Sequence, residues 1–415
     1  MKKLDKYFVL TYNYIGDDFM IDREIYLNEL KRWKDKDLIK VITGIRRCGK
    51  STLFDLYIDY LKSEGIKDNQ IIKINLEDPK YQFENYLDLY NYINDRLNKD
   101  NKNYIFLDEV QNVPEFQRTV DGLYINKNVD LYITGSNAYL LSGELATFLS
   151  GRYIEIEMLP LSFKEFLSSK DDKNELKQYQ NYIEDGGFPY ISKVLDKSEV
   201  NKYLDGVYNT ILMKDVITKN KIGDTMILES VVKFIFDNIG QLVSTKKISD
   251  TLKSNGRGNS VNTIENYITN LIDSYIVYKV SRYDIKGKEF LKTGDKYYVC
   301  DLGLRNYLLG NITNRGSILE NIIFLELKRR GYKIYIGKND DKEIDFIVKN
   351  HDGIKYIQVS ESVRNEATLK REISPLEEIK DNYPKYIITL DYDKCDYNGI
   401  KQISAIDFLL GREDL

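Results

Sequence analysis

The first pattern with a recognisable chemistry is a glycine-bounded loop at residues 44–52, Gly-Ile-Arg-Arg-Cys-Gly-Lys-Ser-Thr. Such glycines let backbone N–H groups converge on phosphate oxygens at the start of a helix, where the helix dipole favours anions. The lysine adds a mobile charge for the β- and γ-phosphates, and the serine hydroxyl is a ligand for Mg²⁺. The pattern therefore predicts a site for ATP and Mg²⁺, although a glycine turn that opens an ordinary helix is the simpler alternative. The predicted binding residues are Gly44, Arg47, Cys48, Gly49, Lys50, Ser51 and Thr52.

Two adjacent carboxylates, Asp108 and Glu109, directly follow the apolar run Tyr104–Leu107. A buried strand has no structural need for paired acids at its carboxyl end, whereas ligands bind open α/β sheets at that edge. Asp108 is predicted to be an outer-sphere Mg²⁺ ligand, which makes Ser51 and Asp108 the metal residues. Glu109, which together with Lys50 belongs to the predicted catalytic group, would polarise the attacking water. Alone, the pattern also describes a strand that runs into a solvated turn.

Ser136 and Arg152 complete the predicted catalytic group. The apolar run Leu131–Thr134 leads into Gly-Ser-Asn, and a small polar side chain at the tip of a neighbouring strand can hydrogen-bond the γ-phosphate or the water. Ser136 is the first choice and Asn137 the second, although turn-forming residues also follow strands without any function. Arg152 would stabilise transition-state charge in this chain or in a neighbouring subunit. The alternative for Arg152 is a solvated surface charge.

These residues need a parallel sheet to bring them together, and the first 160 residues have its pattern. Short apolar runs alternate with amphipathic segments, as in βαβ units. The loop at 44–52 lies between a predicted strand and a predicted helix, as a phosphate-binding loop requires. Strands are expected at 38–43, 71–76, 104–107, 131–134 and 153–158, and helices at 50–63 and 86–97.

Composition excludes several other kinds of chemistry. The 415 residues carry a net charge of −4, so the chain does not coat nucleic acid through bulk charge. The sequence has one histidine and three cysteines without a CxxC pair, so it has too few ligands and bases for zinc sites or histidine-based catalytic triads. The unpaired spacing of the cysteines fits a reducing cytosol. No stretch approaches the ~20 apolar residues that cross a bilayer, so we expect a cytoplasmic protein without membrane contact.

The segments GIRRCGKST, IFLDEVQNV, ITGSNAYLLSG and SGRYIEIEMLPLSFKEF, with GGFP at 186–189, resemble AAA+-related ATPases of bacteria and archaea. The similarity covers essentially the whole chain. It implies an α/β fold class with an ASCE/AAA+-like P-loop ATPase domain, then a winged-helix region and a small PD-(D/E)XK-like α/β module, in a C-terminal region of the DUF4143 type. The expected divisions are the ATPase core at 1–160, a helical segment at 161–225, the winged-helix region at 226–310 and the nuclease-like module at 311–415.

The resemblance to PD-(D/E)XK nucleases can be compared residue by residue. Glu320, Asp345 and Gln358 match the positions that gather metal and activate water in that fold. The lysine expected two residues after Gln358 is replaced by Ser360, and no other residue on that strand supplies the lost cation. We therefore expect a degenerate fold used for binding, with an active nuclease as the alternative. Lys370 or Arg371, on the following segment, could supply the missing positive charge instead.

The pattern from about 226 to 300 is that of a helix-turn-helix followed by a β-wing, with strands at 275–283 and 296–300. Between Ser244 and Lys296, ten basic and six acidic residues give a net charge of +4, which favours contact with a DNA backbone. The expected recognition helix at 262–274 has no lysine or arginine, so DNA contact would be non-specific. Winged helices also bind proteins.

The predicted function is a Mg-ATP-dependent ATPase whose nucleotide state repositions the winged-helix and nuclease-like modules on a nucleic-acid or protein partner. Two alternatives stay open: an ATP-gated, metal-dependent nuclease, and an ATP-binding switch or scaffold with slow turnover. The predicted partners are therefore ATP, DNA and an unknown protein, and self-association also stays open.

Overall fold

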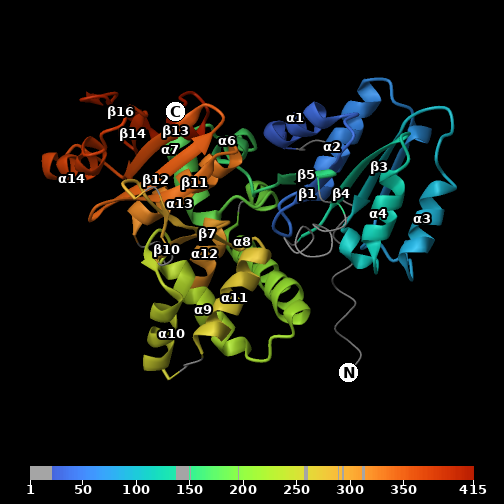
Figure 1. The fold of residues 1–415 in the computed structure, drawn as a ribbon, viewed down its shortest axis with the longest axis horizontal. Helices are drawn as coiled ribbons and strands as arrows, with labels where there is room; N and C mark the ends of the chain where they lie inside the picture. The colour runs from blue at the N-terminus through green and yellow to red at the C-terminus, as the bar shows by residue number, and fades with distance from the viewer. Residues whose placement is uncertain are drawn as a thin grey trace.

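The structure is a computed structural model that describes residues 21–136, 149, 151–194, 196–256, 260–287, 289–291, 294–310 and 314–415. Figure 1 shows two lobes, with the residues before about 160 on the right and the later residues on the left. The second candidate after the fourth predicted strand, Asn137, lies outside the described residues.

The first lobe is built on a five-stranded sheet with the order β2-β3-β4-β1-β5, in which all neighbouring strands are parallel. Every residue of the strands β1 and β3 is buried, as expected for a sheet covered on both faces. This confirms the predicted parallel α/β sheet. The strands are β1 (Ile39–Thr43), β2 (Ile71–Asn75), β3 (Asn103–Asp108), β4 (Val129–Thr134) and β5 (Tyr153–Glu157).

The helix that follows the phosphate loop, α2 (Lys50–Ser63), packs through aromatic side chains on the sheet. The rings of Phe54 and Phe106 have centroids 5.1 Å apart, and those of Tyr57 and Tyr132 have centroids 5.2 Å apart. These contacts fix the start of α2 over the central strands β3 and β4. Among the described residues of this lobe, the other helices and 3-10 turns are α1 (Glu24–Trp33), α3 (Tyr86–Asn94), α4 (Phe116–Tyr124), η1 (Asp68–Gln70) and η2 (Val110–Asn112).

A helical segment connects the lobes, and its GGFP turn at 186–189 is held by a buried aspartate. The N–H of Gly187 donates to Oδ2 of Asp301 over 2.6 Å, and a Cβ on Gly187 would lie 2.6 Å from the carbonyl oxygen of Leu161. Glycine is therefore needed for this close approach. The elements are α6 (Phe163–Ser168), α7 (Glu175–Asp185), η4 (Ile191–Lys193), α8 (Lys197–Thr210), the π-helix η5 (Ile211–Thr218) and α9 (Thr225–Asp237).

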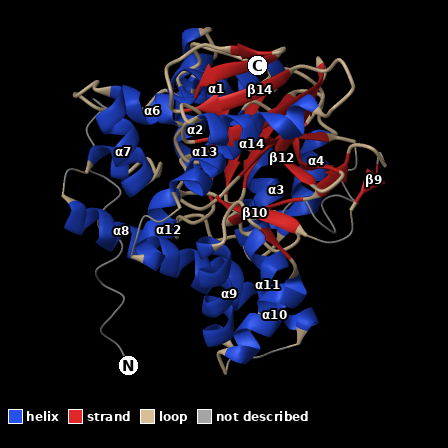
Figure 2. Cartoon of the chain, turned by 90° about the vertical axis from the view of Figure 1, so that its left-hand side faces the viewer, coloured by secondary structure: helices blue, strands red, loops and turns tan. Residues whose placement is uncertain are grey.

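A small antiparallel sheet with the order β6-β10-β7 follows, beside a group of helices. Figure 2 shows α9 and the next two helices gathered at one end of the molecule. The helices and strands are α10 (Thr245–Ser254), α11 (Val261–Asp273), α12 (Leu302–Leu309), β6 (Leu242–Val243), β7 (Val277–Val280) and β10 (Asp295–Val299).

The prediction of a single strand at 275–283 is wrong, because the residues before and after Ser281 belong to two different sheets. Only β7 pairs with β10, whereas the next strand, β8 (Arg282–Asp284), pairs in parallel with β11 (Lys333–Asn339). The hairpin formed by β8 and β9 (Glu289–Phe290) is therefore the edge of a different sheet.

That sheet contains eight strands in the order β15-β16-β14-β13-β12-β11-β8-β9. Its central strands form an antiparallel β11-β12-β13 meander, to which β14 and β16 add in parallel. The remaining elements are β12 (Lys342–Asn350), β13 (Gly353–Ser360), β14 (Lys385–Thr389), β15 (Asp396–Tyr397), β16 (Ile400–Ser404), α13 (Arg315–Arg329), α14 (Glu366–Glu377) and α15 (Ala405–Leu409).

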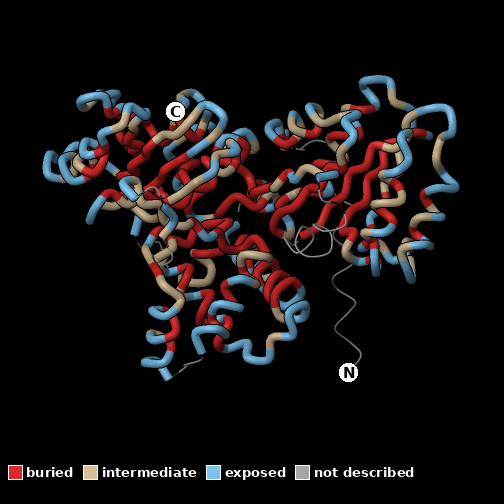
Figure 3. Tube along the Cα trace, viewed as in Figure 1, coloured by how far each residue is buried: buried red, intermediate tan, exposed pale blue. Residues whose placement is uncertain are grey.

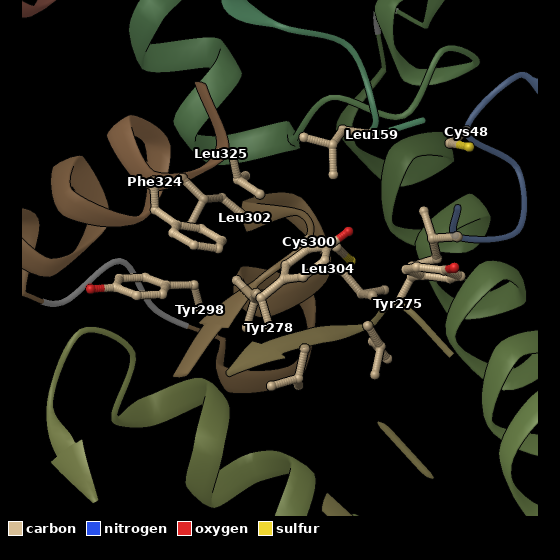
Figure 4. Close-up of a cluster of buried hydrophobic side chains, with 14 of the residues drawn as sticks. Cys48, Leu159, Tyr275, Tyr278, Tyr298, Cys300, Leu302, Leu304, Phe324 and Leu325 are labelled. Atoms are coloured by element: carbon tan, nitrogen blue, oxygen red, sulfur yellow. The ribbon is translucent and has the colours of Figure 1, made fainter. Parts of the chain in front are cut away.

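One apolar core runs through both lobes, and buried segments are continuous across their junction (Figure 3). It includes Cys48 of the phosphate loop, Leu159 after β5, and Tyr275 and Cys300 of the second lobe. Figure 4 shows these side chains in one cluster. The phosphate loop therefore packs directly against the second half of the chain. Among the described residues, no helix is long and apolar enough to cross a membrane.

Candidate functional site

The loop between β1 and α2 holds its two glycines in backbone conformations that residues with a side chain rarely adopt. Gly44 has a φ of 133° and Gly49 a φ of 104°. A Cβ on Gly44 would lie 2.1 Å from the carbonyl oxygen of Met158, so this glycine also permits close packing against the segment after β5. The loop ends at Lys50, the first residue of α2, so the N–H groups of the first turn of α2 lie at its mouth.

Lys50 is 5% exposed and its ammonium group folds back over the loop. Its Nζ donates to the carbonyl oxygens of Gly44 (2.9 Å) and Ile45 (3.2 Å) and lies 3.9 Å from Oε1 of Glu109. Ser51 and Thr52, the next residues of α2, are exposed. The lysine charge, an accessible hydroxyl and the carboxylate predicted to polarise water are thus brought together at one place.

Asp108 and Glu109 lie at the carboxyl end of β3 and are 1% and 7% exposed. The hydroxyl of Thr134, at the end of β4, donates to Oδ1 of Asp108 and accepts the backbone N–H of Glu109 over 2.9 Å. Glu109 has a φ of 55°, a left-handed conformation that is rare for a residue with a side chain and that clusters at functional sites. The side-chain amide of Gln111 donates to Oε2 of Glu109. Sequence reasoning missed Thr134, whose only signal was its place at the end of the strand next to β3.

Ser136 follows β4 and is 1% exposed, at the same edge of the sheet as the phosphate loop. Its Oγ lies 3.4 Å from Nη2 of Arg46. Arg46 was not among the predicted binding residues, which included its neighbour Arg47 instead. Arg47 is exposed and has a φ of 70°, whereas the guanidinium of Arg46 turns inward.

Arg23 fixes the back of the loop. It is 3% exposed and donates to the carbonyl oxygens of Cys48 (2.8 Å) and Leu159 (2.6 Å) and to Oε1 of Glu165 (2.9 Å). Burial raises the pKa of the Cys48 thiol, so this cysteine is a packing residue in the loop rather than a nucleophile. Arg23 and the apolar core that runs through both lobes therefore fix the position of the phosphate loop.

The assignment of Arg152 to the same active site within one chain is wrong. Its carbonyl oxygen accepts the N–H of Ile39 at the start of β1, so Arg152 lies at the amino edge of the sheet, opposite the phosphate loop. Its guanidinium donates to Oδ1 of Asp121 over 2.6 Å, and its side chain is 45% exposed. A role toward a neighbouring subunit stays a prediction.

In the second lobe, Glu320 on α13 and Asp345 on β12 meet, as the nuclease-like pattern predicts, but the cation between them comes from β10. Nζ of Lys296 lies 2.8 Å from Oε1 of Glu320, 2.8 Å from Oε1 of Glu343 and 3.3 Å from Oδ1 of Asp345. Lys296 is 2% exposed. The replacements considered on the following segment, Lys370 and Arg371, are both exposed, and Arg371 pairs with Glu372.

Gln358 on β13 completes this cluster without adding a charge. Its Oε1 accepts the N–H of Asp345 over 3.2 Å, and its amide donates to Glu372 over 3.1 Å. Oδ2 of Asp345 accepts the N–H of Val359 over 2.9 Å. Ser360 donates to the carbonyl oxygen of Ser362 and points no charge at the cluster. Across the described residues, no group of three or more His, Cys, Asp or Glu side chains is arranged to hold a metal ion.

Comparison with known proteins identifies the kind of chain to which this site belongs. Residues 36–167 match the model of an AAA domain, and residues 176–315 match a domain of unknown function, DUF8612, where the sequence analysis expected the DUF4143 type. The chain is 44% identical to an uncharacterized protein of Haemophilus influenzae over 399 residues, which cover 94% of this chain and 99% of that protein. It is 33% identical to an uncharacterized protein of Methanocaldococcus jannaschii over 387 residues, 87% of this chain and 82% of that protein.

Among solved structures, the Walker-type ATPase of Pyrococcus abyssi is similar with a TM-score of 0.50 and 15% identity. The match covers 70% of this chain and 96% of that one. At this identity the likeness concerns the fold alone. With the parallel sheet and the AAA match, it confirms the predicted AAA+-related P-loop fold.

Proposed function

The chain belongs to the same family as its Haemophilus influenzae and Methanocaldococcus jannaschii relatives and carries an AAA domain, and from this premise we propose that it binds and hydrolyses Mg-ATP. One observation carries the proposal: the ammonium group of Lys50 lies over the phosphate loop and 3.9 Å from Glu109. A cation held by loop carbonyls beside a buried carboxylate is poised to exchange those carbonyls for phosphate oxygens.

The residues at the mouth of the loop fit a magnesium ion. Ser51 presents an accessible hydroxyl in the first turn of α2, and Asp108 presents a carboxylate oriented by Thr134. Oxygen donors of this kind suit Mg²⁺, which in this position neutralises phosphate charge. We assign the backbone N–H groups of 44–52 and Lys50 to phosphate binding.

Glu109 is the group that orients the attacking water in this proposal. Its left-handed backbone and its contacts with Thr134 and Gln111 hold the carboxylate beside Lys50. Positioning and electrostatics dominate phosphoryl transfer, so an oriented carboxylate suffices without a covalent intermediate. Ser136 lies at the same sheet edge and is assigned to the γ-phosphate or the water.

We propose that nucleotide state repositions the second lobe, which we divide at 161–225, 226–310 and 311–415. The helices α9, α10 and α11 with the β6-β10-β7 sheet support a winged-helix region. The helix α13 with the β11-β12-β13 meander and the parallel strand β14 supports a PD-(D/E)XK-like module. Both assignments rest on topology.

The partner of the winged-helix region is a nucleic acid or a protein. The basic excess predicted from the sequence is partly used inside the chain, because Lys296 is buried and Lys279 and Lys286 form ion pairs with Asp295 and Asp340. Three of the ten basic residues lie outside the described residues: Arg257, Lys288 and Lys292. Among the described residues, fewer cations are therefore available to a DNA backbone than the sequence count alone indicates.

The nuclease alternative has one observation in its favour, the buried Lys296 beside Glu320 and Asp345. This lysine supplies a cation in place of the one missing at Ser360, but its ammonium group lies directly on the carboxylates that a metal ion would need. We therefore prefer a module in which this lysine replaces a metal as the internal counter-ion, and we expect no cleavage of DNA.

Steady-state assays on the full chain test the proposal. We expect hydrolysis of Mg-ATP and no Mg²⁺- or Mn²⁺-dependent cleavage of supercoiled plasmid, with or without ATP. Cleavage that disappears in Asp345→Ala would favour the ATP-gated nuclease. Tight ATP binding without measurable turnover would favour the switch or scaffold.

A further inference from the structure

Arg46 connects the phosphate loop to the helical segment through a buried, two-pronged ion pair. Its Nε donates to Oδ2 of Asp215 over 3.0 Å, and its Nη2 donates to Oδ1 of the same carboxylate over 3.1 Å. The two side chains are 13% and 9% exposed. Paired hydrogen bonds between a guanidinium and a carboxylate are among the stronger polar contacts in proteins, and they fix geometry as well as distance.

The same guanidinium also lies beside Ser136, which is assigned to the γ-phosphate or the water. Its Nη1 donates to Oε1 of Glu77, just after β2, over 2.8 Å, and its Nη2 lies 3.4 Å from Oγ of Ser136, just after β4. Arg46 itself follows β1. The guanidinium therefore sits at the carboxyl edge of the sheet, where the phosphate loop and Asp108 also lie.

Asp215 lies in the middle of η5, an eight-residue π-helix that continues α8 without a break. π-helical turns are rare, and they occur mostly at functional positions, because their wider backbone is less favourable than an α-helix. The backbone carbonyl of Asp215 accepts a hydrogen bond from the hydroxyl of Ser274, at the end of α11, over 3.4 Å. Asp215 thus contacts the phosphate loop through its side chain and the end of α11 through its backbone.

We propose that Arg46 is a γ-phosphate-reading residue, which exchanges the carboxylate of Asp215 for the γ-phosphate of ATP and thereby releases η5 from the phosphate loop. The exchange rests on the proposed function, since it requires ATP at the loop. Carboxylate and phosphate oxygens present the same acceptor geometry to a guanidinium fork, so the two compete for Arg46. ADP has no γ-phosphate and leaves the ion pair in place.

This exchange couples two free energies, and coupling is reciprocal. If ATP must break the Arg46–Asp215 pair, then removing the pair must raise ATP affinity by the same factor by which ATP weakens the pair. The expected change is an increase in ATP affinity of about ten-fold for Asp215→Asn, the size of one charge-assisted hydrogen bond. ADP affinity is expected to stay at the wild-type value.

Calorimetry on the full chain with the non-hydrolysed analogue AMPPNP and with ADP tests the proposal. Asp205→Asn is the matched control. Asp205 lies in α8, which η5 continues, and it contacts Asn209 and Tyr307 rather than the phosphate loop. In the Arg46→Ala background, Asp215→Asn should no longer change the ratio of AMPPNP to ADP affinity. An increase that persists in that background would show a general effect of the lost negative charge, and it would overturn the exchange.

Hydrogen exchange gives a second measurement that does not depend on affinity. AMPPNP, but not ADP, should raise amide exchange at 211–218 in the wild type, and Arg46→Ala should remove that nucleotide dependence. Equal exchange with both nucleotides in a chain that binds both would overturn the inference and leave the proposed function intact. A wild-type chain that binds neither nucleotide would overturn the proposed function itself.

Discussion

The ammonium group of Lys296, on β10, lies 2.8 Å from Oε1 of Glu320, on α13, and both side chains are buried. Burial raises the pKa of Glu320 to about 7, although the lysine charge opposes this shift. The pair joins the small β6-β10-β7 sheet to the helix α13.

Lys296→Met should lower the free energy of unfolding by about 3–5 kcal/mol, because it leaves the buried carboxylates of Glu320 and Asp345 without their cation. Denaturation in urea would measure the change. Lys279→Met is the control on the neighbouring strand β7, since the side chain of Lys279 is 43% exposed and the loss of its pair with Asp295 should cost less than about 1 kcal/mol. Equal losses in the two variants would contradict an internal counter-ion role.

Asp301 should make stability depend on pH. Burial raises its pKa to about 6, although the N–H groups of Gly187 and Leu304 that bond its carboxylate lower it. The folded state keeps this proton up to about pH 6, whereas the unfolded state loses it near pH 4, so the stabilisation is present at low pH and is lost as the pH rises through 6.

Asp301→Asn tests this sign, because asparagine does not titrate. Between about pH 4 and pH 7 the wild type should lose on the order of 3 kcal/mol of unfolding free energy relative to the variant. Urea denaturation of both proteins at each pH would measure the difference. A stability of the wild type relative to the variant that stays constant, or that rises with pH, would contradict the assignment.

Glu109→Gln should keep ATP bound while steady-state turnover falls by about 10²–10⁴-fold, because the amide keeps the shape of the side chain but cannot orient and activate water. Glu115→Gln is the matched control, since Glu115 also has a left-handed backbone nearby but is exposed and pairs with Arg118. If turnover in Glu109→Gln equals that of the wild type, another group orients the water, and Ser136 is the next residue to test.

Thr134 is predicted to be a positioning residue, because its hydroxyl ties Asp108 to the backbone of Glu109. Thr134→Val should lower turnover with little change in ATP affinity, and Thr134→Ser should restore it, since serine keeps the hydroxyl. A purely structural role predicts instead that both variants lose stability and that turnover follows stability. Kinetics and thermal unfolding on the same samples separate the two outcomes.

The local part of this molecule was predictable from sequence. The strand before the phosphate loop was expected at 38–43 in spite of Lys40, whose charge the structure pairs with the buried Asp130 of β4. The position of Lys50 followed from a motif that combines a strand, a loop and a helix in fixed order, and that of the Asp108–Glu109 pair from an apolar strand that ends in two acids. Short-range pattern sufficed, because each of these features involves residues close together in the chain.

Long-range pairings were not predictable in the same way. Arg46 and Asp215 lie 169 residues apart, and nothing in the spacing of either segment indicates the other. The ion pairs of Lys296 with Glu320 and Asp345 were not predictable for the same reason, because Lys296 lies on β10, far from both partners in the chain. Ser281 has no local signal for the change of sheet that follows it, since strand pairing partners depend on packing across the whole module.

Calorimetry of ATP binding to the wild type and to Lys50→Ala tests the central claim most directly. Lys62→Ala is the control, because Lys62 lies at the other end of α2 and pairs with the exposed Asp68. Thermal unfolding of each protein shows whether it is folded. We predict that the wild type and Lys62→Ala bind Mg-ATP, and that a folded Lys50→Ala does not. Equal ATP affinity in all three proteins would contradict the assignment of the loop at 44–52 as the nucleotide site.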